Sequence, residues 1–162
     1  MKNILLLIAL ASFAASSTAS AEPPRLFVGT DPIGLVHDSY ALTASYALSD
    51  HVAARGEIQL DRDDFDSLEV WHYRASLPLF LDRTFHGPFI EPGFVQMHAT
   101  YMNYDIQTFG PSMMVGYQWT FHDRYSIAGA FGESKIWSTS STPGVLYAGG
   151  GPEWYVRVGY VF

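Results

Sequence analysis

The stretch that decides the fold is Trp154-Tyr155-Val156-Arg157-Val158-Gly159-Tyr160-Val161-Phe162. Every second residue in it, from Trp154 to Phe162, is apolar or aromatic, and Arg157 and Gly159 fall on the alternate positions. Successive side chains of a β-strand point to opposite faces, so a period of two predicts a strand with one apolar face.

The same alternation recurs along the chain, whereas no stripe with a period of 3.6 residues is found after Glu22. It is clear in the segments 40–48, 113–121 and 125–131. Turn signals separate eight expected strands, at 25–36, 40–48, 51–61, 68–80, 87–98, 108–121, 124–133 and 151–162. The sequence therefore predicts an all-β protein, an eight-stranded antiparallel up-and-down β-barrel.

Two environments fit an alternating barrel. In a soluble lipocalin-like barrel the apolar face points inward, whereas in a transmembrane β-barrel it meets lipid. Charged residues make up only 15% of the chain and aromatic residues another 15%, while soluble domains carry about 25% charged residues. The polar face is rich in Ser, Thr, Gly, Ala and Gln, which fit a narrow lumen. Composition therefore favours the transmembrane barrel.

The first residues predict export. Lys2 precedes an apolar run over residues 4–15, and Ala19-Ser20-Ala21 has the small-x-small pattern of a signal-peptidase site. The run is shorter than the roughly 20 residues that a membrane-spanning helix needs. We expect residues 1–21 to be a cleaved signal peptide and residues 22–162 to form one barrel domain in the bacterial outer membrane.

Connection lengths predict the orientation. Ser49-Asp50, residues 81–86 and His122-Asp123 form short turns, whereas residues 61–67, 99–107 and 134–150 form longer loops. Short periplasmic and long external connections are typical of outer-membrane barrels, so both termini should be periplasmic. This orientation places aromatic girdles at both membrane interfaces. They comprise Tyr40, Tyr46, Trp71, Trp119, Phe121, Tyr125, Trp154, Tyr160 and Phe162.

Short motifs also carry a resemblance. Tyr160-Val161-Phe162 resembles the C-terminal signature that the barrel-assembly machinery recognises. The segments 87–94, 116–119 and 126–132 resemble a family of small bacterial outer-membrane barrels of unknown function, similar to OmpA/OmpX-like eight-stranded barrels. The resemblance implies a fold, an outer-membrane location and contact with membrane lipids and lipopolysaccharide. It implies no activity.

Charged residues on the polar faces are the first candidate site. They are Arg55, Glu57, His72, Arg74, Glu91, Glu153 and Arg157. The lumen of eight strands is wide enough only for side chains. Unpaired charges there would be costly, so we expect Arg and Glu to pair as a structural filling. A narrow pore or proton path is the functional alternative.

The pair His37 and Ser39 suggests a second candidate, a lipid A-modifying enzyme similar to a deacylase, on one face at the outer end of the first strand. Such chemistry needs a base near the hydroxyl and an orienting carboxylate. The deacylase motif, however, has Asn after the Ser and lies late in the chain, whereas Tyr40 follows here. We therefore expect no catalytic activity.

Asp61, Asp63, Asp64 and Asp66 are candidates for a Ca²⁺ site or for bridging to lipopolysaccharide, but a solvated acidic loop is the favoured interpretation. They do not fit the EF-hand pattern. The net charge of −7 argues against nucleic-acid binding. We expect a monomer without cofactors, acting in envelope integrity or in surface interaction through its external loops.

Overall fold

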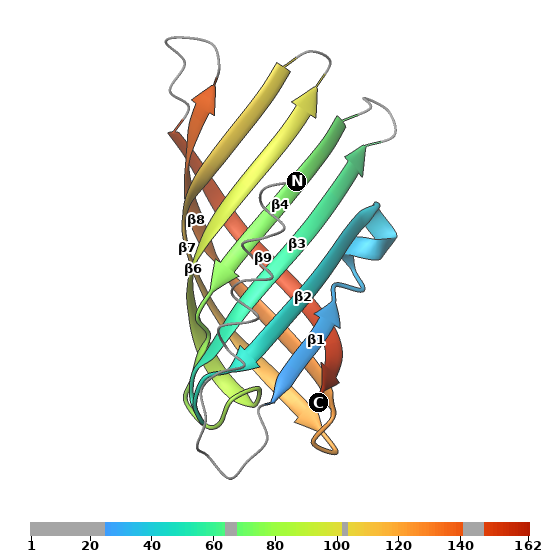
Figure 1. Cartoon of the computed structure of the whole chain (residues 1–162), viewed down its shortest axis with the longest axis vertical. Helices are drawn as coiled ribbons and strands as arrows, with labels where there is room; N and C mark the ends of the chain where they lie inside the picture. Colours follow the sequence, from blue (N-terminus) through green and yellow to red (C-terminus); the bar gives the residue numbers. More distant parts are fainter. Residues whose placement is uncertain (1–24, 64–67, 102–103, 141–147) are drawn as a thin grey trace.

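The computed structural model describes residues 25–63, 68–101, 104–140 and 148–162 (Figure 1). The predicted signal peptide, residues 1–21, lies outside them. The strands are β1 (Leu26–Thr30), β2 (Ser39–Ala47), β3 (Ala53–Asp63), β4 (Leu68–Ser76), β5 (Leu79–Phe80), β6 (Gly87–Tyr101), β7 (Tyr104–Phe121), β8 (Tyr125–Ser140) and β9 (Ala148–Val161). A 3-10 turn, η1, covers Gly34–His37. No helix in these ranges is long and apolar enough to cross a membrane.

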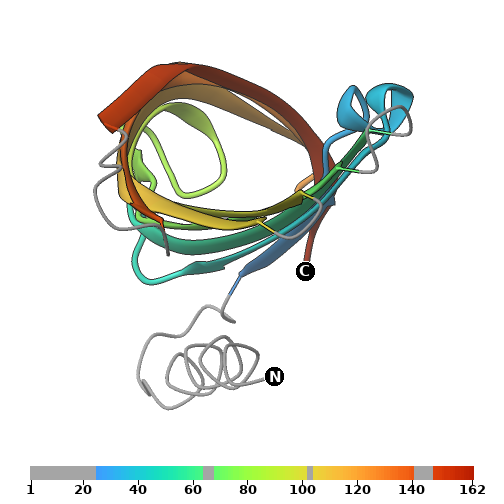
Figure 2. The ribbon, with the colours of Figure 1, turned by 90° about the horizontal axis from the view of Figure 1, so that it is seen from above.

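The strands form one antiparallel sheet that closes on itself. The order β4-β3-β2-β1-β9-β8-β7-β6-β5 is completed by pairing of β4 with β6. The short β5 follows β4 along the same edge of β6, because it pairs with β6 at Leu79↔Ile90 and Phe80↔Phe89. Viewed from above, the strands make a ring (Figure 2). The predicted all-β, eight-stranded antiparallel barrel is confirmed.

The two faces of each strand differ as the alternation predicts. In β8, the inward Ser126, Ala128 and Ala130 are buried, and the outward Ile127 and Phe131 are exposed. Cross-strand neighbours share a face, so the register extends this division around the ring. The barrel has a filled polar interior and an exposed apolar exterior.

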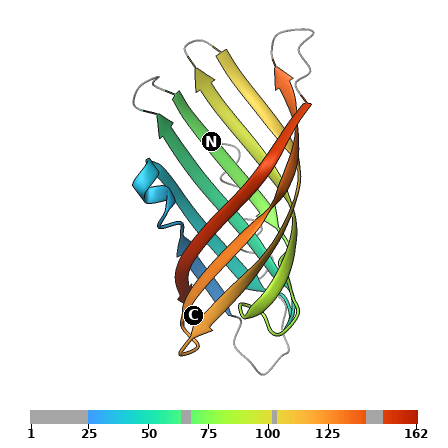
Figure 3. The same ribbon diagram turned by 180° about the vertical axis from the view of Figure 1, so that it is seen from behind.

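The first strand is shorter than predicted. The range 25–36 was expected to be extended, but β1 ends at Thr30 and η1 follows. The Asp31 carboxylate accepts the backbone N–H groups of Ile33 and Gly34 at 2.8 and 3.1 Å, and Pro32 has no N–H to donate to a ladder. β1 consequently pairs with β9 over only Phe27–Thr30, and η1 projects from the wall (Figure 3).

The hairpins on the opposite wall are longer than predicted. β6, β7 and β8 extend to Tyr101, Tyr104 and Ser140, so most of the loop expected at 99–107 and the first half of that expected at 134–150 are strand. β9 also begins earlier than expected, at Ala148. The wall is therefore tall at β6–β9 and low at β1–β2 (Figure 1).

The largest departure lies between β4 and β6. The range 68–80 was expected to be one strand, but β4 ends at Ser76 and Pro78 precedes β5. Residues 81–86 were expected to be a plain turn, yet Thr84 and Phe85 in it are buried. The segment bends inside the ring at the end where the described chain starts and finishes (Figures 1 and 2). The turn thus closes that end of the barrel.

Candidate functional site

The interior is filled first by a group of polar side chains around Arg55, here called the Arg55 cluster. Arg55 and Glu91 are fully buried and form an ion pair with Nη1 2.6 Å from Oε2. Glu91 also accepts hydrogen bonds from Ser76 at 2.6 Å and from the Tyr155 hydroxyl at 2.5 Å. The carboxylate is therefore held by three donors from three strands.

The rest of the Arg55 guanidinium is also engaged. It donates to the Ser45 hydroxyl at 2.8 Å, the Tyr155 hydroxyl at 2.9 Å and the Gln118 side-chain oxygen at 3.2 Å. The Gln118 amide donates in turn to Ser126 at 2.8 Å. Hydrogen bonds donated by a charged guanidinium are strong and geometrically specific. The cluster therefore ties strands on opposite sides of the ring together.

A second group lies nearer the tall end of the wall and is here called the Arg157 cluster. Arg157 donates through Nε to Glu57 at 2.6 Å, with Nη2 2.5 Å from the same carboxylate oxygen. Thr43 donates to that oxygen at 2.7 Å. Arg74 pairs with Glu153, and its Nη1 lies 3.8 Å from Glu57. Across both clusters, three arginines face three glutamates, so the buried charge is balanced.

The two clusters are continuous. Arg157 Nη1 lies 3.9 Å from Glu91 Oε2, and the Arg157 guanidinium lies 3.3 Å from the centroid of the Tyr155 ring. A cation over an aromatic face is stabilised by the ring quadrupole, more so when it is desolvated. The six charged side chains therefore form one connected column and not separate pairs.

Beyond the Arg157 cluster, toward the tall end of the barrel, His72 and Asp61 form a partly exposed pair, with Nε2 2.8 Å from Oδ2. Gln59 and Ser39 also donate to Asp61. The expectation that His37 and Ser39 share one face of the first strand is wrong, because His37 lies in η1 and Ser39 begins β2. The His37 side chain is exposed in η1.

The aspartates expected in one acidic loop are placed differently. Asp61 and Asp63 belong to β3, and Asp61 faces the lumen among its donors. Asp64 and Asp66 lie outside the described residues. Within the described ranges, no group of three or more His, Cys, Asp or Glu side chains is arranged to hold a metal ion.

Below the Arg55 cluster, four buried phenylalanines, Phe27, Phe80, Phe85 and Phe89, form what we call the aromatic plug. Phe80 packs on Phe89 and Phe85 at centroid distances of 5.3 and 6.1 Å, and Phe85 packs on Phe27 at 6.0 Å. The Arg55 guanidinium lies 5.7 Å from the Phe89 ring. Apolar packing thus replaces the polar column at this end.

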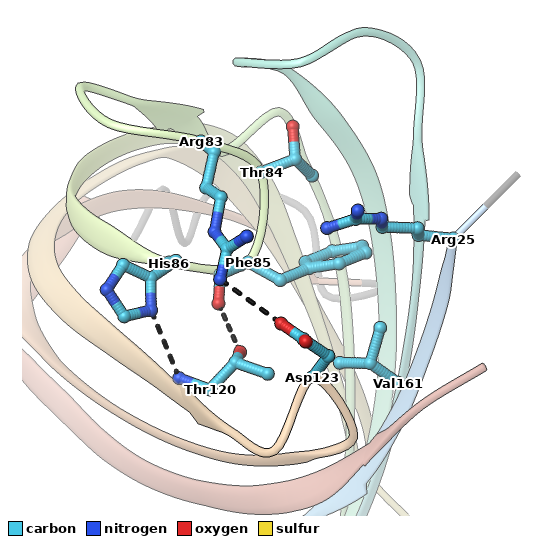
Figure 4. A pocket seen from close by; sticks show the side chains of 8 residues that line it. All are labelled: Arg25, Arg83, Thr84, Phe85, His86, Thr120, Asp123 and Val161. Atoms are coloured by element: carbon cyan, nitrogen blue, oxygen red, sulfur yellow. Dashed lines mark hydrogen bonds and ion pairs between the residues drawn. The ribbon is translucent and has the colours of Figure 1, made fainter. Parts of the chain in front are cut away.

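The loop that carries Phe85 is tied to the neighbouring turns. Thr84 bonds to the carbonyls of Asp50 and Ser49 at 2.6 Å each, and Thr120 donates to the carbonyl of Phe85 at 2.5 Å. Arg83 forms an exposed ion pair with Asp123 at 3.3 Å. Figure 4 shows the contacts of Thr120 with Phe85 and of Arg83 with Asp123 beside a hollow of about 10 Å³, too small for more than one water molecule.

The aromatic residues of the predicted girdles lie on the outward face in two groups. At the plug end, Trp119 packs on Phe121 at 4.6 Å, and Tyr160 packs on Tyr125 and Phe162 at 5.5 and 4.8 Å. Tyr46 lies at the same end of the barrel, where it pairs with Leu26 at the start of β1. Toward the tall end are Tyr40, Trp71 and Trp154, all exposed.

Several interior residues were not singled out from the sequence. Tyr155, Gln118, Thr43 and Ser45 were placed on polar faces only by their parity, and nothing local marks them as partners of Arg55 or Glu57. The plug had one available signal, because Phe89 shares the parity of Glu91 and so belongs to the inward face of β6. An aromatic residue out of phase with its strand indicates local packing inside the barrel.

No family model, curated protein or solved structure matches this chain. The site must therefore be interpreted from its geometry. A column of paired charges closed by aromatic rings can hold the strands of the barrel together.

Proposed function

We propose that the protein is a non-enzymatic outer-membrane β-barrel that serves envelope integrity or surface interaction through its tall external hairpins. The observation that carries the proposal is the contrast between the faces: balanced ion pairs inside and large apolar side chains outside. Phe131 and Trp154 are 68% and 64% exposed on the outward wall. Contiguous apolar surface of this extent marks a membrane or protein interface, and closed barrels are the β-structures that can span lipid.

The aromatic groups support the same proposal. Tyr and Trp prefer the headgroup level at each side of a bilayer, and the outward aromatics gather at the plug end and toward the tall end. Both described ends of the chain lie at the plug end, where Leu26 and Phe162 exchange backbone bonds at 3.4 and 2.8 Å. We assign this end to the periplasm, with lipopolysaccharide around the opposite rim and the C-terminal strand as the segment that the barrel-assembly machinery would bind.

The filled interior disfavours the two alternative functions, a narrow channel and a lipid A-modifying enzyme. A conducting path would have to cross both the paired charges and the aromatic plug. For a deacylase, a histidine should stand between a serine and a carboxylate, but here Asp61 stands between Ser39 and His72. The proposed role is therefore that of a structural scaffold.

Membrane location is tested by expression of the full chain in a Gram-negative host. We expect the mature protein in the outer-membrane fraction, and a gel band that migrates faster without boiling than after it, because a closed barrel survives cold dodecyl sulfate. The pairing of β1 with β9 closes the ring, so a variant that lacks residues 26–30 is the control that should lose the fast band. A soluble periplasmic product from the unaltered chain would overturn the proposal.

A further inference from the structure

β1 closes the ring along only part of β9. It pairs with β9 as far as Thr30↔Val158, whereas β9 begins at Ala148 and pairs with β8 along the whole of this stretch. β1 stops well below the upper end of β9 (Figures 1 and 3). Over residues 148–157, one edge of β9 is therefore without a partner strand in the part of the chain that the structure describes.

The backbone groups on this free edge follow from the ladder. Phe162 exchanges two backbone bonds with Leu26, so its N–H and C=O face β1. Alternate residues of an antiparallel strand face the same neighbour, and β9 is in unbroken register with β8. The N–H and C=O groups of Trp154 and Val156 consequently face the side that β1 has left. On that side, the described residues give these groups no backbone partner.

The chain that follows β1 does not fill the vacant position. It forms η1, which lies beside β2 and projects from the wall (Figure 3). Ile33, Leu35 and Val36 are 37%, 48% and 79% exposed, so their side chains are not packed between β9 and β2. β2 itself extends beyond its last β1 partner, Thr43, to Ser39. The vacant position is therefore flanked by β9 on one side and by β2 on the other.

Two features limit the free edge. Below it, Val158 pairs with Thr30. Above it, Pro152 has the parity of Trp154 and has no N–H to donate, and a proline on an edge strand opposes the addition of another strand. The stretch between these limits, residues 153–157, matches the usual strand length of about 5 residues.

The free edge selects an extended peptide as its occupant. Its N–H and C=O groups lie in a row with the repeat of a β-strand, and another extended backbone matches that row, as when a peptide adds a strand to a sheet. Cross-strand neighbours share a face. Residues opposite Trp154 and Val156 would therefore face outward, and residues opposite the buried Tyr155 and Arg157 would face the filled lumen.

A second copy of the chain is a poor occupant. Barrels in one membrane insert in the same direction, so the two-fold axis of a dimer lies along the membrane normal. Strands tilted by about 35–45° have opposite tilts where two such copies meet. Two β9 edges would thus cross instead of running side by side.

We propose that the free edge of β9, at Trp154 and Val156, binds one extended segment of another polypeptide, which adds a strand between β9 and β2. The segment alternates apolar residues, which face outward, with small or hydroxyl-bearing residues, which face the lumen. The backbone geometry does not depend on the proposed membrane location. That location adds one consequence: hydrocarbon offers the free edge no hydrogen bond, so binding of the segment is favoured further.

The test uses Trp154, which lies on the free edge, as the reporter. In the full-length chain, Trp71, Trp119 and Trp137 are replaced by Phe, and the protein is placed in phosphatidylcholine vesicles. The probe is a short capped peptide of alternating threonine and valine, with a spin-labelled cysteine in place of the central valine, because a nitroxide quenches tryptophan at short range. We expect saturable quenching of Trp154. The same peptide N-methylated at every residue cannot donate hydrogen bonds, and its quenching should rise only in proportion to its concentration.

Two substitutions of Val156 test the bond on the protein side. Val156→Pro removes an N–H that faces the vacant position and none that pairs with β8. It should weaken peptide binding by about tenfold or more, the equivalent of one hydrogen bond left unmade. Val156→Thr keeps the N–H and the β-branched shape and should bind as the parent does. If Val156→Pro lost the fast-migrating gel band, the N-methylated peptide alone would decide.

Equal, non-saturating quenching by the unmodified and the N-methylated peptides would overturn the free edge as a binding site. A dimer that forms without peptide and is dissociated by Val156→Pro would also overturn the proposal, because a second copy would then occupy the edge. Flotation of the vesicles tests the membrane location separately. If the chain did not float with them, the proposed membrane location would fail, and the same titration in water would still decide the inference.

Discussion

Replacing Glu91 with leucine is expected to destabilise the barrel by about 3–5 kcal/mol. Glu91 is fully buried and forms the ion pair of Arg55, so its removal leaves a guanidinium in the interior without its carboxylate. Ser76 and Tyr155 lose their acceptor at the same time. The measurement is equilibrium unfolding in urea from phospholipid vesicles, followed by tryptophan fluorescence.

Two comparisons isolate the cause of that loss. Combining Glu91→Leu with Arg55→Met should recover part of the stability, because it removes the unpaired buried charge, whereas Ser76 and Tyr155 still lack their acceptor. Glu69→Gln breaks the exposed Arg62–Glu69 pair and should cost less than about 1 kcal/mol. If Glu91→Leu were no more harmful than Glu69→Gln, the column of ion pairs would not hold the barrel together.

Phe85→Ala is expected to have the next largest effect, a loss of about 3–5 kcal/mol. The ring is 1% exposed and packs between Phe27 and Phe80, so its removal leaves a cavity in the aromatic plug. The same urea titration measures the loss. Phe85 itself lies between β5 and β6 and pairs with no neighbouring strand, and the variant should therefore keep the fast-migrating gel band.

Phe94→Ala is the control for the plug. This phenylalanine projects outward and is exposed, so its removal leaves no interior cavity and should cost much less than Phe85→Ala. The plug also predicts that the unaltered protein gives no steady conductance in planar bilayers. Steady unit conductance, or equal losses for Phe85→Ala and Phe94→Ala, would contradict the assignment of the plug.

The barrel could be predicted from the sequence because apolar and polar residues alternate with a period of two in nearly every strand. It was also sufficient to place Arg55, Glu57, Arg74, Glu91, Glu153 and Arg157 on inward faces, since parity alone decides the face of a strand residue. Partners could not be assigned in the same way. Arg55 and Tyr155 are 100 residues apart in the chain, and their contact depends on the stagger of the whole ring.

The ends of the strands were the part that local patterns described poorly. At Asp31-Pro32, a side chain that accepts two backbone N–H groups ends the strand although the following residues are apolar. At residues 81–86, burial of Phe85 comes from packing against Phe27 and Phe80, which no local turn signal encodes. A local bond between side chain and backbone therefore decides the backbone path at Asp31, and tertiary packing decides it at Phe85.

The central claim is that the apolar face meets lipid, and spin labels on β8 test it most directly. The chain has no cysteine, so single cysteines at Ile127, Gly129 and Phe131 can be labelled cleanly, with Asp50 in an exposed turn as the aqueous reference. In vesicles we predict high collision rates with oxygen and low rates with a water-soluble nickel chelate at all three β8 positions, and the reverse at Asp50. Nickel accessibility at the three positions equal to that at Asp50 would contradict the account.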